Sequence, residues 1–247
     1  ECPFWSAVRP RVEAGGSLDR FAAEEHRFDR WPALPRWWLG HRRPSRSVLS
    51  YTAHLEALVR GIAAESGRRV VIDSSKVLSR ALAYDRLHAE TFDVRFIHLV
   101  RDGRDVLASR THRRARTAVD PAAVDPRLDA IRYSALWTAA NLLIVALLGR
   151  KPGRYLRLRY EDFVRDPATA LNRIGAFLAL DYAPVARRAE AREPIAIGHI
   201  VAGNRMRRDG VVALRRTADS PRDRLRPSER RTYAWIAGSV ARVFGYR

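Results

Sequence analysis

Cysteine is almost absent from this chain of 247 residues, which has only Cys2. An internal disulfide and a cysteine-rich zinc cluster each need more than one thiol, so both are excluded. Long apolar runs are also scarce. The longest, 135–148, contains Thr138 and Asn141 and is shorter than the roughly 20 residues that span a bilayer. It is therefore interpreted as a buried helix, and because no signal peptide is visible, the expected location is the cytoplasm.

Lysine is scarce as well. Lys76 and Lys151 are the only lysines, so the other 44 of the 46 basic residues are arginines. With 27 acidic residues, the formal net charge is +19. So strong an arginine bias can follow from codon usage, which weakens any inference from charge to nucleic acid, and no specific nucleic-acid partner is expected. A basic domain still attracts a polyanionic nucleotide, an acidic glycan or a membrane surface.

The motif G-x-x-x-x-G-K-[ST] of P-loop kinases is missing too. Gly15-Gly16 is the only glycine pair, and no strand is predicted before it. A kinase-like P-loop enzyme is therefore disfavoured.

Length and composition indicate one globular domain over 1–247, with 47% hydrophobic and 30% charged residues. Residues 1–46 are rich in Trp, Pro and Arg, and 47–247 form an α/β core. The N-terminal aromatics are Phe4, Trp5, Trp31, Trp37 and Trp38. Such aromatics can stack on sugars or bases, but packing inward is the preferred interpretation.

The apolar pattern of the core alternates between strands and helices, which predicts an α/β fold with a parallel sheet. Strands are expected at 70–72, 96–100 and 154–160. Helices are expected at 47–66, 77–89, 103–114, 127–148, 167–178, 184–192 and 227–244. The helix at 127–148 is expected to be buried, and its apolar positions are Ile131, Leu136, Leu142, Leu143 and Val145.

The most informative stretch is 94–110, V-R-F-I-H-L-V-R-D-G-R-D-V-L-A-S-R. Its apolar run suits a strand buried on both faces, and Asp102 suits the N-cap of a helix, with Asp105 three residues later. A helix N-terminus at the carboxyl edge of a sheet attracts anions, and Arg101 adds a planar charged fork. The alternative is an ordinary β-α turn with a surface arginine.

Residues 101–109, R-D-G-R-D-V-L-A-S, resemble the 3′-phosphate-binding motif of sulfotransferases that use 3′-phosphoadenosine 5′-phosphosulfate. Residues 155–163 resemble the strand of that family that ends in Y-E-D, and 203–207 resemble the loop that closes over the nucleotide in bacterial members. The resemblance runs in order from about residue 70 to the C-terminus. It implies a P-loop-NTPase-like three-layer fold, 3′-phosphoadenosine 5′-phosphosulfate as co-substrate and no metal.

The resemblance also assigns roles to individual residues. It implies that Arg101, Ser109 and Arg207 hold the 3′-phosphate and that Tyr160 contacts the nucleotide. In D-S-S-K, Lys76 matches the family's lysine near the transferred sulfuryl group, where a compact ammonium can stabilise developing negative charge. The alternatives are a surface lysine at a helix start and a structural tyrosine.

The catalytic base stays open between Asp73 and His199, and a lone histidine is more often structural. The acceptor is expected to be a hydroxyl of a small molecule, glycan, lipid or peptide tyrosine. The oligomeric state is not predicted.

One family motif has no counterpart, because nothing in the chain is similar to the loop G-x-x-R-S-G-T-T that cradles the 5′-phosphosulfate. With Glu1 rather than Met at the start, we expect the first strand and this loop to lie upstream. The chain alone is then predicted to be weakly active or inactive, with an unfilled position in its sheet. The alternative function is a non-catalytic basic α/β module that binds a nucleotide or polyanion.

Overall fold

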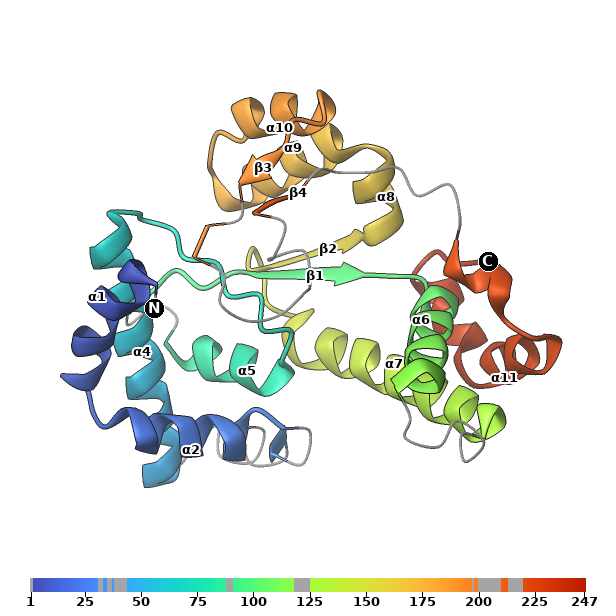
Figure 1. The fold of residues 1–247 in the computed structure, drawn as a ribbon, viewed down its shortest axis with the longest axis horizontal. Helices are drawn as coiled ribbons and strands as arrows, with labels where there is room; N and C mark the ends of the chain where they lie inside the picture. The colour runs from blue at the N-terminus through green and yellow to red at the C-terminus, as the bar shows by residue number, and fades with distance from the viewer. Residues whose placement is uncertain are drawn as a thin grey trace. The chain divides into compact units, whose positions relative to one another are not determined.

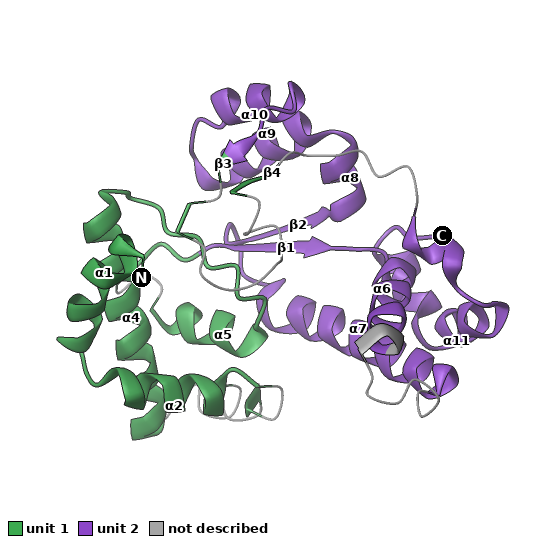
Figure 2. Ribbon diagram, viewed as in Figure 1, with its two compact units in different colours: residues 1–94, 196–211 green, residues 95–195, 212–247 purple. Residues whose placement is uncertain are grey.

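The computed structural model shows the chain as two compact units, which Figure 2 distinguishes by colour. Unit 1 comprises residues 1–94 and 196–211, and unit 2 comprises 95–195 and 212–247. The structure describes residues 2–30, 33–34, 37, 44–87, 91–117, 125–196, 198–199, 210–212 and 220–247, with the side chains of 115–117 and 212 left out. The predicted nucleotide loop at 203–207, with Arg207, lies outside these residues. The single-domain organisation stays a prediction, because compact units need not fold separately.

Unit 1 is helical and is built on α4 (Arg46–Ser66). This helix contacts α1 (Pro3–Glu13), α2 (Leu18–Phe28) and α5 (Leu78–Arg86), and Figure 1 shows them in blue to turquoise. The helix predicted at 47–66 is confirmed, and it has a capping residue at each end. The Ser45 hydroxyl accepts a hydrogen bond from the Val48 N–H at 3.4 Å, and Gly67 ends the helix at φ 63°.

The core of unit 1 confirms the inward packing predicted for the N-terminal aromatics at Trp37, whereas Phe4 and Trp5 are only partly buried. Phe28 and Trp37 are 1% and 4% exposed, and their ring centroids lie 5.7 Å apart. The buried cluster consists of Phe28, Ala33, Trp37, Val48, Tyr51, Leu55, Ala83 and Leu87. Trp31 and Trp38 lie outside the described residues.

The strand predicted at 70–72 is wrong. Residues 70–77 form no regular element, and Val70 and Ile72 are 45% and 76% exposed. A strand needs a neighbour to satisfy its backbone hydrogen bonds, and no described strand lies beside this segment. The following helix, α5, is shorter than the predicted 77–89.

Unit 2 contains a parallel pair of strands, β1 (Phe96–Val100) and β2 (Tyr155–Arg159). Phe96 pairs with Tyr155 and Val100 with Arg159, so the two strands end together. The predicted strands at 96–100 and 154–160 and their parallel direction are confirmed. The chain is therefore a mixed α/β protein with a small parallel sheet, while the three-layer P-loop-like arrangement stays a prediction.

Burial on both faces of β1 was wrong. His98 and Val100 are buried, but Ile97 and Leu99 on the other face are 42% and 47% exposed. Among the described residues only β2 pairs with β1, so the expected unfilled position in the sheet stays a prediction.

The helices of unit 2 follow the sequence pattern closely, although one of them was not predicted. They are α6 (Gly103–Thr117), α7 (Pro126–Leu148), α8 (Tyr160–Arg165), α9 (Pro167–Leu178), α10 (Ala183–Glu190), the 3₁₀ turn η4 (Pro221–Arg224) and α11 (Pro227–Val243). The unpredicted helix is α8, whose first residues are Y-E-D. The two-residue strands β3 (Ile195–Ala196) and β4 (Val211–Val212) lie where the chain passes between units.

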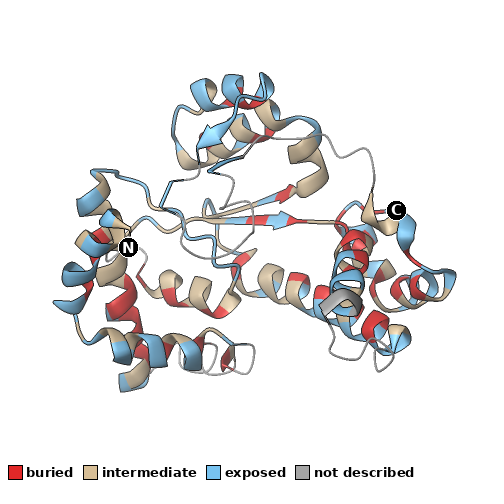
Figure 3. Cartoon of the chain, in the orientation of Figure 1, coloured by how far each residue is buried: buried red, intermediate tan, exposed pale blue. Residues whose placement is uncertain are grey.

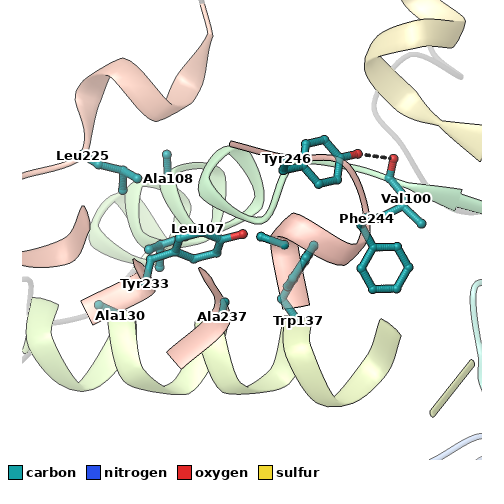
Figure 4. Packing of buried hydrophobic residues seen from close by; sticks show 11 residues of the cluster. Val100, Leu107, Ala108, Ala130, Trp137, Leu225, Tyr233, Ala237, Phe244 and Tyr246 are labelled. Atoms are coloured by element: carbon teal, nitrogen blue, oxygen red, sulfur yellow. Dashed lines mark hydrogen bonds between the residues drawn. The ribbon is translucent and has the colours of Figure 1, made fainter. Parts of the chain in front are cut away.

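The core of unit 2 lies between α6, α7 and α11, as Figure 4 shows. Trp137 of α7 is central, with the rings of Tyr233 and Phe244 at 6.1 and 6.0 Å between centroids. The cluster consists of Val100, Leu107, Ala108, Ala130, Trp137, Leu225, Tyr233, Ala237, Ala241, Phe244 and Tyr246. It joins the end of β1 to the last residues of the chain.

Helix α7 is confirmed in extent, but it is less buried than predicted. Ile131, Leu136 and Leu142 are 48%, 41% and 47% exposed, whereas Trp137 and Asn141 are buried. Figure 3 shows pale blue segments along this helix. The apolar residues of α7 lie on all sides of the helix, so their pattern does not indicate which side faces the core. The side with Trp137 and Asn141 faces the core, where both side chains form hydrogen bonds.

By length and composition, α7 could also cross a membrane, the only helix of the described chain with that property. This is weak support for a membrane span, because helices in globular cores share these properties. In the structure, α7 contacts α6, α11 and β1.

Candidate functional site

The candidate site forms where β1 and β2 end side by side. Because Val100 pairs with Arg159, the next residues, Arg101 and Tyr160, lie opposite each other, followed by Asp102 and Glu161. The guanidinium carbon of Arg101 lies 4.9 Å from the centroid of the Tyr160 ring, a cation–π contact. The Asp102 N–H donates to Glu161 Oε1 at 2.8 Å. Two of the motifs that carry the family resemblance are therefore in direct contact.

Asp102 is fully buried and caps α6, as predicted. Its Oδ1 accepts from the Arg104 N–H at 2.9 Å, and its Oδ2 accepts from the guanidinium groups of Arg104 and Arg222 at 2.7 and 2.8 Å. Burial alone would raise the pKa of Asp102, but these hydrogen bonds outweigh it and hold the pKa below its usual value. Asp102 thus neutralises two arginines and fixes the start of α6.

Asp105, three residues after Asp102, binds a segment that is distant in the sequence. Its Oδ1 accepts from the Ser220 hydroxyl at 2.5 Å and from the Arg222 N–H at 3.0 Å. It therefore anchors η4 against the first turn of α6. Together with the ion pair between Asp102 and Arg222, it fixes this C-terminal segment close to the strand end.

Glu161 and Tyr246 hold the other side of the strand end. The Tyr246 hydroxyl lies 2.9 Å from the Val100 carbonyl oxygen and 2.8 Å from Glu161 Oε2. Its single proton can be donated to one of these acceptors at a time. Burial and the Glu161 carboxylate raise the pKa of Tyr246. The Glu161 carboxylate of Y-E-D therefore organises the backbone of the candidate site and does not project freely from it.

These contacts correct the expectation of free N–H groups at the start of α6. The Asp102 and Arg104 N–H groups already donate to carboxylates of the protein. Two N–H groups at this edge are therefore already used by the protein itself, and Arg101 offers a side chain to an anion. Its backbone carbonyl is held by Trp137 Nε1 at 3.0 Å, and its buried Nε has no hydrogen-bond partner in the described structure.

The environment of Arg101 fits a phosphate group. The guanidinium contacts the Tyr160 ring, and no carboxylate of the described residues forms an ion pair with it. A partly buried guanidinium with an unused N–H group gains most from a ligand that supplies anionic oxygens. The 3′-phosphate of a nucleotide has this chemistry.

Ser109 lies further from this centre than Arg101 and Tyr160 do. It is exposed on α6, six residues after Gly103, or about 9 Å along the helix axis at 1.5 Å per residue. No hydrogen bond joins Ser109 to Arg101 in the described structure. The shared phosphate role predicted for these two residues is untested.

Lys76 belongs to unit 1 and is exposed, with a left-handed backbone at φ 64°. This conformation is strained for a residue with a Cβ and persists only where neighbouring contacts hold it. The preceding turn provides such contacts through Asp73. Its Oδ1 accepts from the Ser75 N–H at 2.7 Å, and its Oδ2 accepts from the Tyr84 hydroxyl at 2.8 Å.

The two base candidates have different surroundings, both in unit 1. Asp73 also lies 3.7 Å from Arg80, a 11% exposed arginine that pairs with Asp29 and Glu25. The His199 ring stacks on Phe4 at 4.5 Å between centroids. These contacts are typical of structural roles, and neither residue is tested as a base.

The sequence interpretation missed a buried polar triad behind the sheet. Asn141 donates to the Trp137 carbonyl oxygen at 2.7 Å, so its Oδ1 is left to accept from His98 Nε2 at 3.0 Å. His98 Nδ1 then accepts from the Tyr155 hydroxyl at 2.6 Å. Burial is the main cause that lowers the pKa of His98 to about 4; the hydrogen bond to Asn141 opposes this shift and the charge of Arg157 adds to it. The interruption of two apolar runs by His98 and Asn141 was the available signal.

Comparison with known proteins agrees with the family resemblance. A sequence profile described as the sulfotransferase family matches residues 4–184. Carbohydrate sulfotransferase 4 of Mus musculus is 33% identical over 127 residues, which cover 47% of this chain and 33% of that protein. Carbohydrate sulfotransferase 5 of Mus musculus is 30% identical over 136 residues, which cover 49% and 34%. The match thus spans about a third of each relative, and no solved structure matches the chain significantly.

Proposed function

The chain belongs to the sulfotransferase family, and on that premise we propose that it contributes to transfer of a sulfuryl group from 3′-phosphoadenosine 5′-phosphosulfate to a hydroxyl acceptor. The observation that carries this proposal is the position of Arg101 over Tyr160 at the joint end of two parallel strands. The carboxyl edge of a parallel sheet is the usual ligand site of α/β proteins.

In this proposal, Arg101 binds the 3′-phosphate of the nucleotide and Tyr160 keeps the guanidinium in place. Ser109 and Arg207 supply further contacts to the same phosphate, and Lys76 stabilises the sulfuryl oxygens. In the reaction, the bond from sulfur to the bridging phosphate oxygen breaks while the acceptor oxygen bonds to sulfur. The acceptor proton passes to a base, for which Asp73 and His199 are the candidates.

A glycan hydroxyl is the acceptor class that we favour. Two relatives of similar sequence are named carbohydrate sulfotransferases, although each is matched over only a third of its length. The strongly basic chain also suits an acidic glycan. Small-molecule, lipid and peptide acceptors remain alternatives.

Calorimetric titration of adenosine 3′,5′-bisphosphate into this chain tests the nucleotide site. We expect saturable binding that Arg101→Ala weakens by about tenfold or more, because a charge-assisted contact is worth about 1.5–3 kcal/mol. The matched control is Arg110→Ala, which removes an exposed arginine from α6 and should leave the affinity within about twofold. Equal affinity of the Arg101→Ala variant and the wild type would contradict the site.

The second candidate function is a basic module that binds the nucleotide or a polyanion without catalysis. It is favoured by the absence of a phosphosulfate loop from the given sequence. Measurable sulfuryl transfer by this chain would exclude it. Rapid transfer would also contradict the prediction that the chain alone is weakly active or inactive.

A further inference from the structure

The outer side of α11 carries a tryptophan that the core does not use. Trp235 is 88% exposed, whereas Tyr233, Ala237 and Ala241 of the same helix are buried. Figure 3 shows buried and exposed segments alternating along α11. A large aromatic side chain is stabilised when it leaves water, so this exposed indole offers a flat apolar face that a ligand can cover.

The neighbours of Trp235 on this side of the helix are small. Gly238 and Ser239 follow it by three and four residues, so they share its side of the helix. A Cβ added at Gly238 would meet nothing within 4 Å, so the chain's own packing gives no reason for a glycine. Glycine is also less favourable than alanine inside a helix. Helical side chains lean towards the N-terminus, so a longer side chain at 238 would reach towards the indole.

Two arginines flank the indole. Arg231 lies four residues before Trp235 and Arg242 seven residues after it, and both are exposed. The Arg242 guanidinium donates to the Ser239 hydroxyl at 3.3 Å, which holds it beside the small residues. The surface therefore combines a flat apolar ring, open space next to it and positive charge at both ends. We name the surface of Arg231, Trp235, Gly238, Ser239 and Arg242 the Trp235 platform.

We propose that the Trp235 platform binds an acidic glycan, with one sugar ring stacked on the indole and sulfate or carboxylate groups paired with Arg231 and Arg242. The apolar face of a pyranose ring matches an aromatic plane, and guanidinium groups bind planar or tetrahedral anions in forked geometry. The choice of a glycan rests on the proposed function, but binding at the platform requires no turnover. The platform lies on α11, whereas the proposed nucleotide site lies at the ends of β1 and β2.

Charge and geometry favour a glycan over the other occupants. An interfacial membrane helix needs a continuous apolar face, and the apolar face of α11 is buried against α6 and α7. Only Trp235 and Val243 are exposed large apolar residues on this helix. A second copy of the chain would bring another basic surface, since the net charge is +19.

Surface plasmon resonance with a heparin-derived hexasaccharide tests the platform in the full chain. We expect Trp235→Ala to weaken binding about tenfold and Gly238→Gln about fivefold, in proportion to the stacking that each change removes. Gly238→Gln improves helix propensity, so a loss of binding cannot be attributed to unfolding. Arg150→Ala, which removes an exposed arginine outside the platform, should stay within about twofold.

Inorganic polyphosphate separates stacking from charge alone. We expect Trp235→Ala to leave polyphosphate binding unchanged, because polyphosphate has no ring to stack. The proposal is overturned if both platform variants bind the hexasaccharide like the wild type, or if hexasaccharide and polyphosphate lose affinity equally. Loss in Trp235→Ala of binding to phosphatidylserine vesicles, or of concentration-dependent dimers, would identify a membrane or a second copy instead. In every case, titration of adenosine 3′,5′-bisphosphate reports separately on the nucleotide site.

Discussion

The guanidinium of Arg101 lies over the ring of Tyr160, 4.9 Å from its centroid, although 59 positions separate the two residues in the chain. The contact follows from the strand register, which brings the residues after Val100 and Arg159 opposite each other. It presents an arginine whose orientation is fixed before any ligand binds. Such preorganisation lowers the conformational entropy that binding would otherwise lose.

Tyr160 should therefore act on nucleotide affinity through its ring. Tyr160→Phe keeps the ring and should change the affinity for adenosine 3′,5′-bisphosphate by less than about twofold, while Tyr160→Ala should weaken it about three- to tenfold. Calorimetric titration measures both. An equal loss in the two variants would instead assign the effect to the hydroxyl group.

Asp102 should be important for stability, because it is the buried counter-ion of two arginines. We expect Asp102→Asn to lower the free energy of unfolding by about 2–4 kcal/mol, since it leaves Arg104 and Arg222 without their carboxylate. Urea unfolding followed by tryptophan fluorescence measures the change. Asp223→Asn, at an exposed carboxylate of η4, should stay within about 0.5 kcal/mol of the wild type. A similarly small change at Asp102 would mean that the ion pairs contribute little.

His98 should make stability depend on pH between about 6.5 and 4. Its pKa is lowered to about 4 in the folded state from 6.5, so the unfolded chain binds the proton first as pH falls. The contribution of neutral His98 to the free energy of unfolding is complete above pH 6.5 and is lost as the pH falls from 6.5 to about 4. A shift of this size corresponds to about 3 kcal/mol.

Urea unfolding at a series of pH values checks this dependence. His98→Gln should be less stable at pH 7 and should lack this part of the slope. His112→Gln, at an exposed histidine of α6, should keep the wild-type slope. An unchanged slope in His98→Gln would show that other groups control the acid side of the curve.

Gly103 and Gly238 should respond oppositely to alanine. At Gly103, a Cβ would lie 2.5 Å from the Tyr233 hydroxyl and 2.8 Å from Trp137 Cδ2, so we expect a loss of about 1–3 kcal/mol from overpacking. At Gly238, where the space is open, alanine should stabilise by about 0.5–1 kcal/mol through helix propensity. Thermal unfolding compares the two variants: stabilisation by alanine at Gly103 would contradict the close packing there, and destabilisation at Gly238 would contradict the open space there.

Much of unit 2 could be predicted because its elements begin with local signals. Asp166 accepts from the Thr169 N–H at 3.0 Å at the start of α9, and Asp102 accepts from the Arg104 N–H at the start of α6. Both helices therefore begin directly after an N-cap residue. The meeting of Arg101 and Tyr160 was not predicted, because strand register depends on long-range pairing.

Other features depend on partners distant in sequence. Asp105 binds Ser220, 115 residues away, and no local pattern indicates that contact. The prediction that α7 is buried was only partly right, because its apolar residues lie on all sides and only the side with Trp137 and Asn141 is turned into the core. Residues 70–72 have the composition of a strand but no described neighbour to pair with.

The exposed, left-handed position of Lys76 has a practical consequence for chemical labelling. The whole sequence contains only one other lysine, Lys151, so side-chain amine reagents have two possible targets. After digestion, each acylated lysine can be assigned by mass spectrometry without mutagenesis. The rate of acylation at Lys76, compared with that at Lys151, therefore gives a direct chemical reading of whether an added ligand covers the D-S-S-K turn.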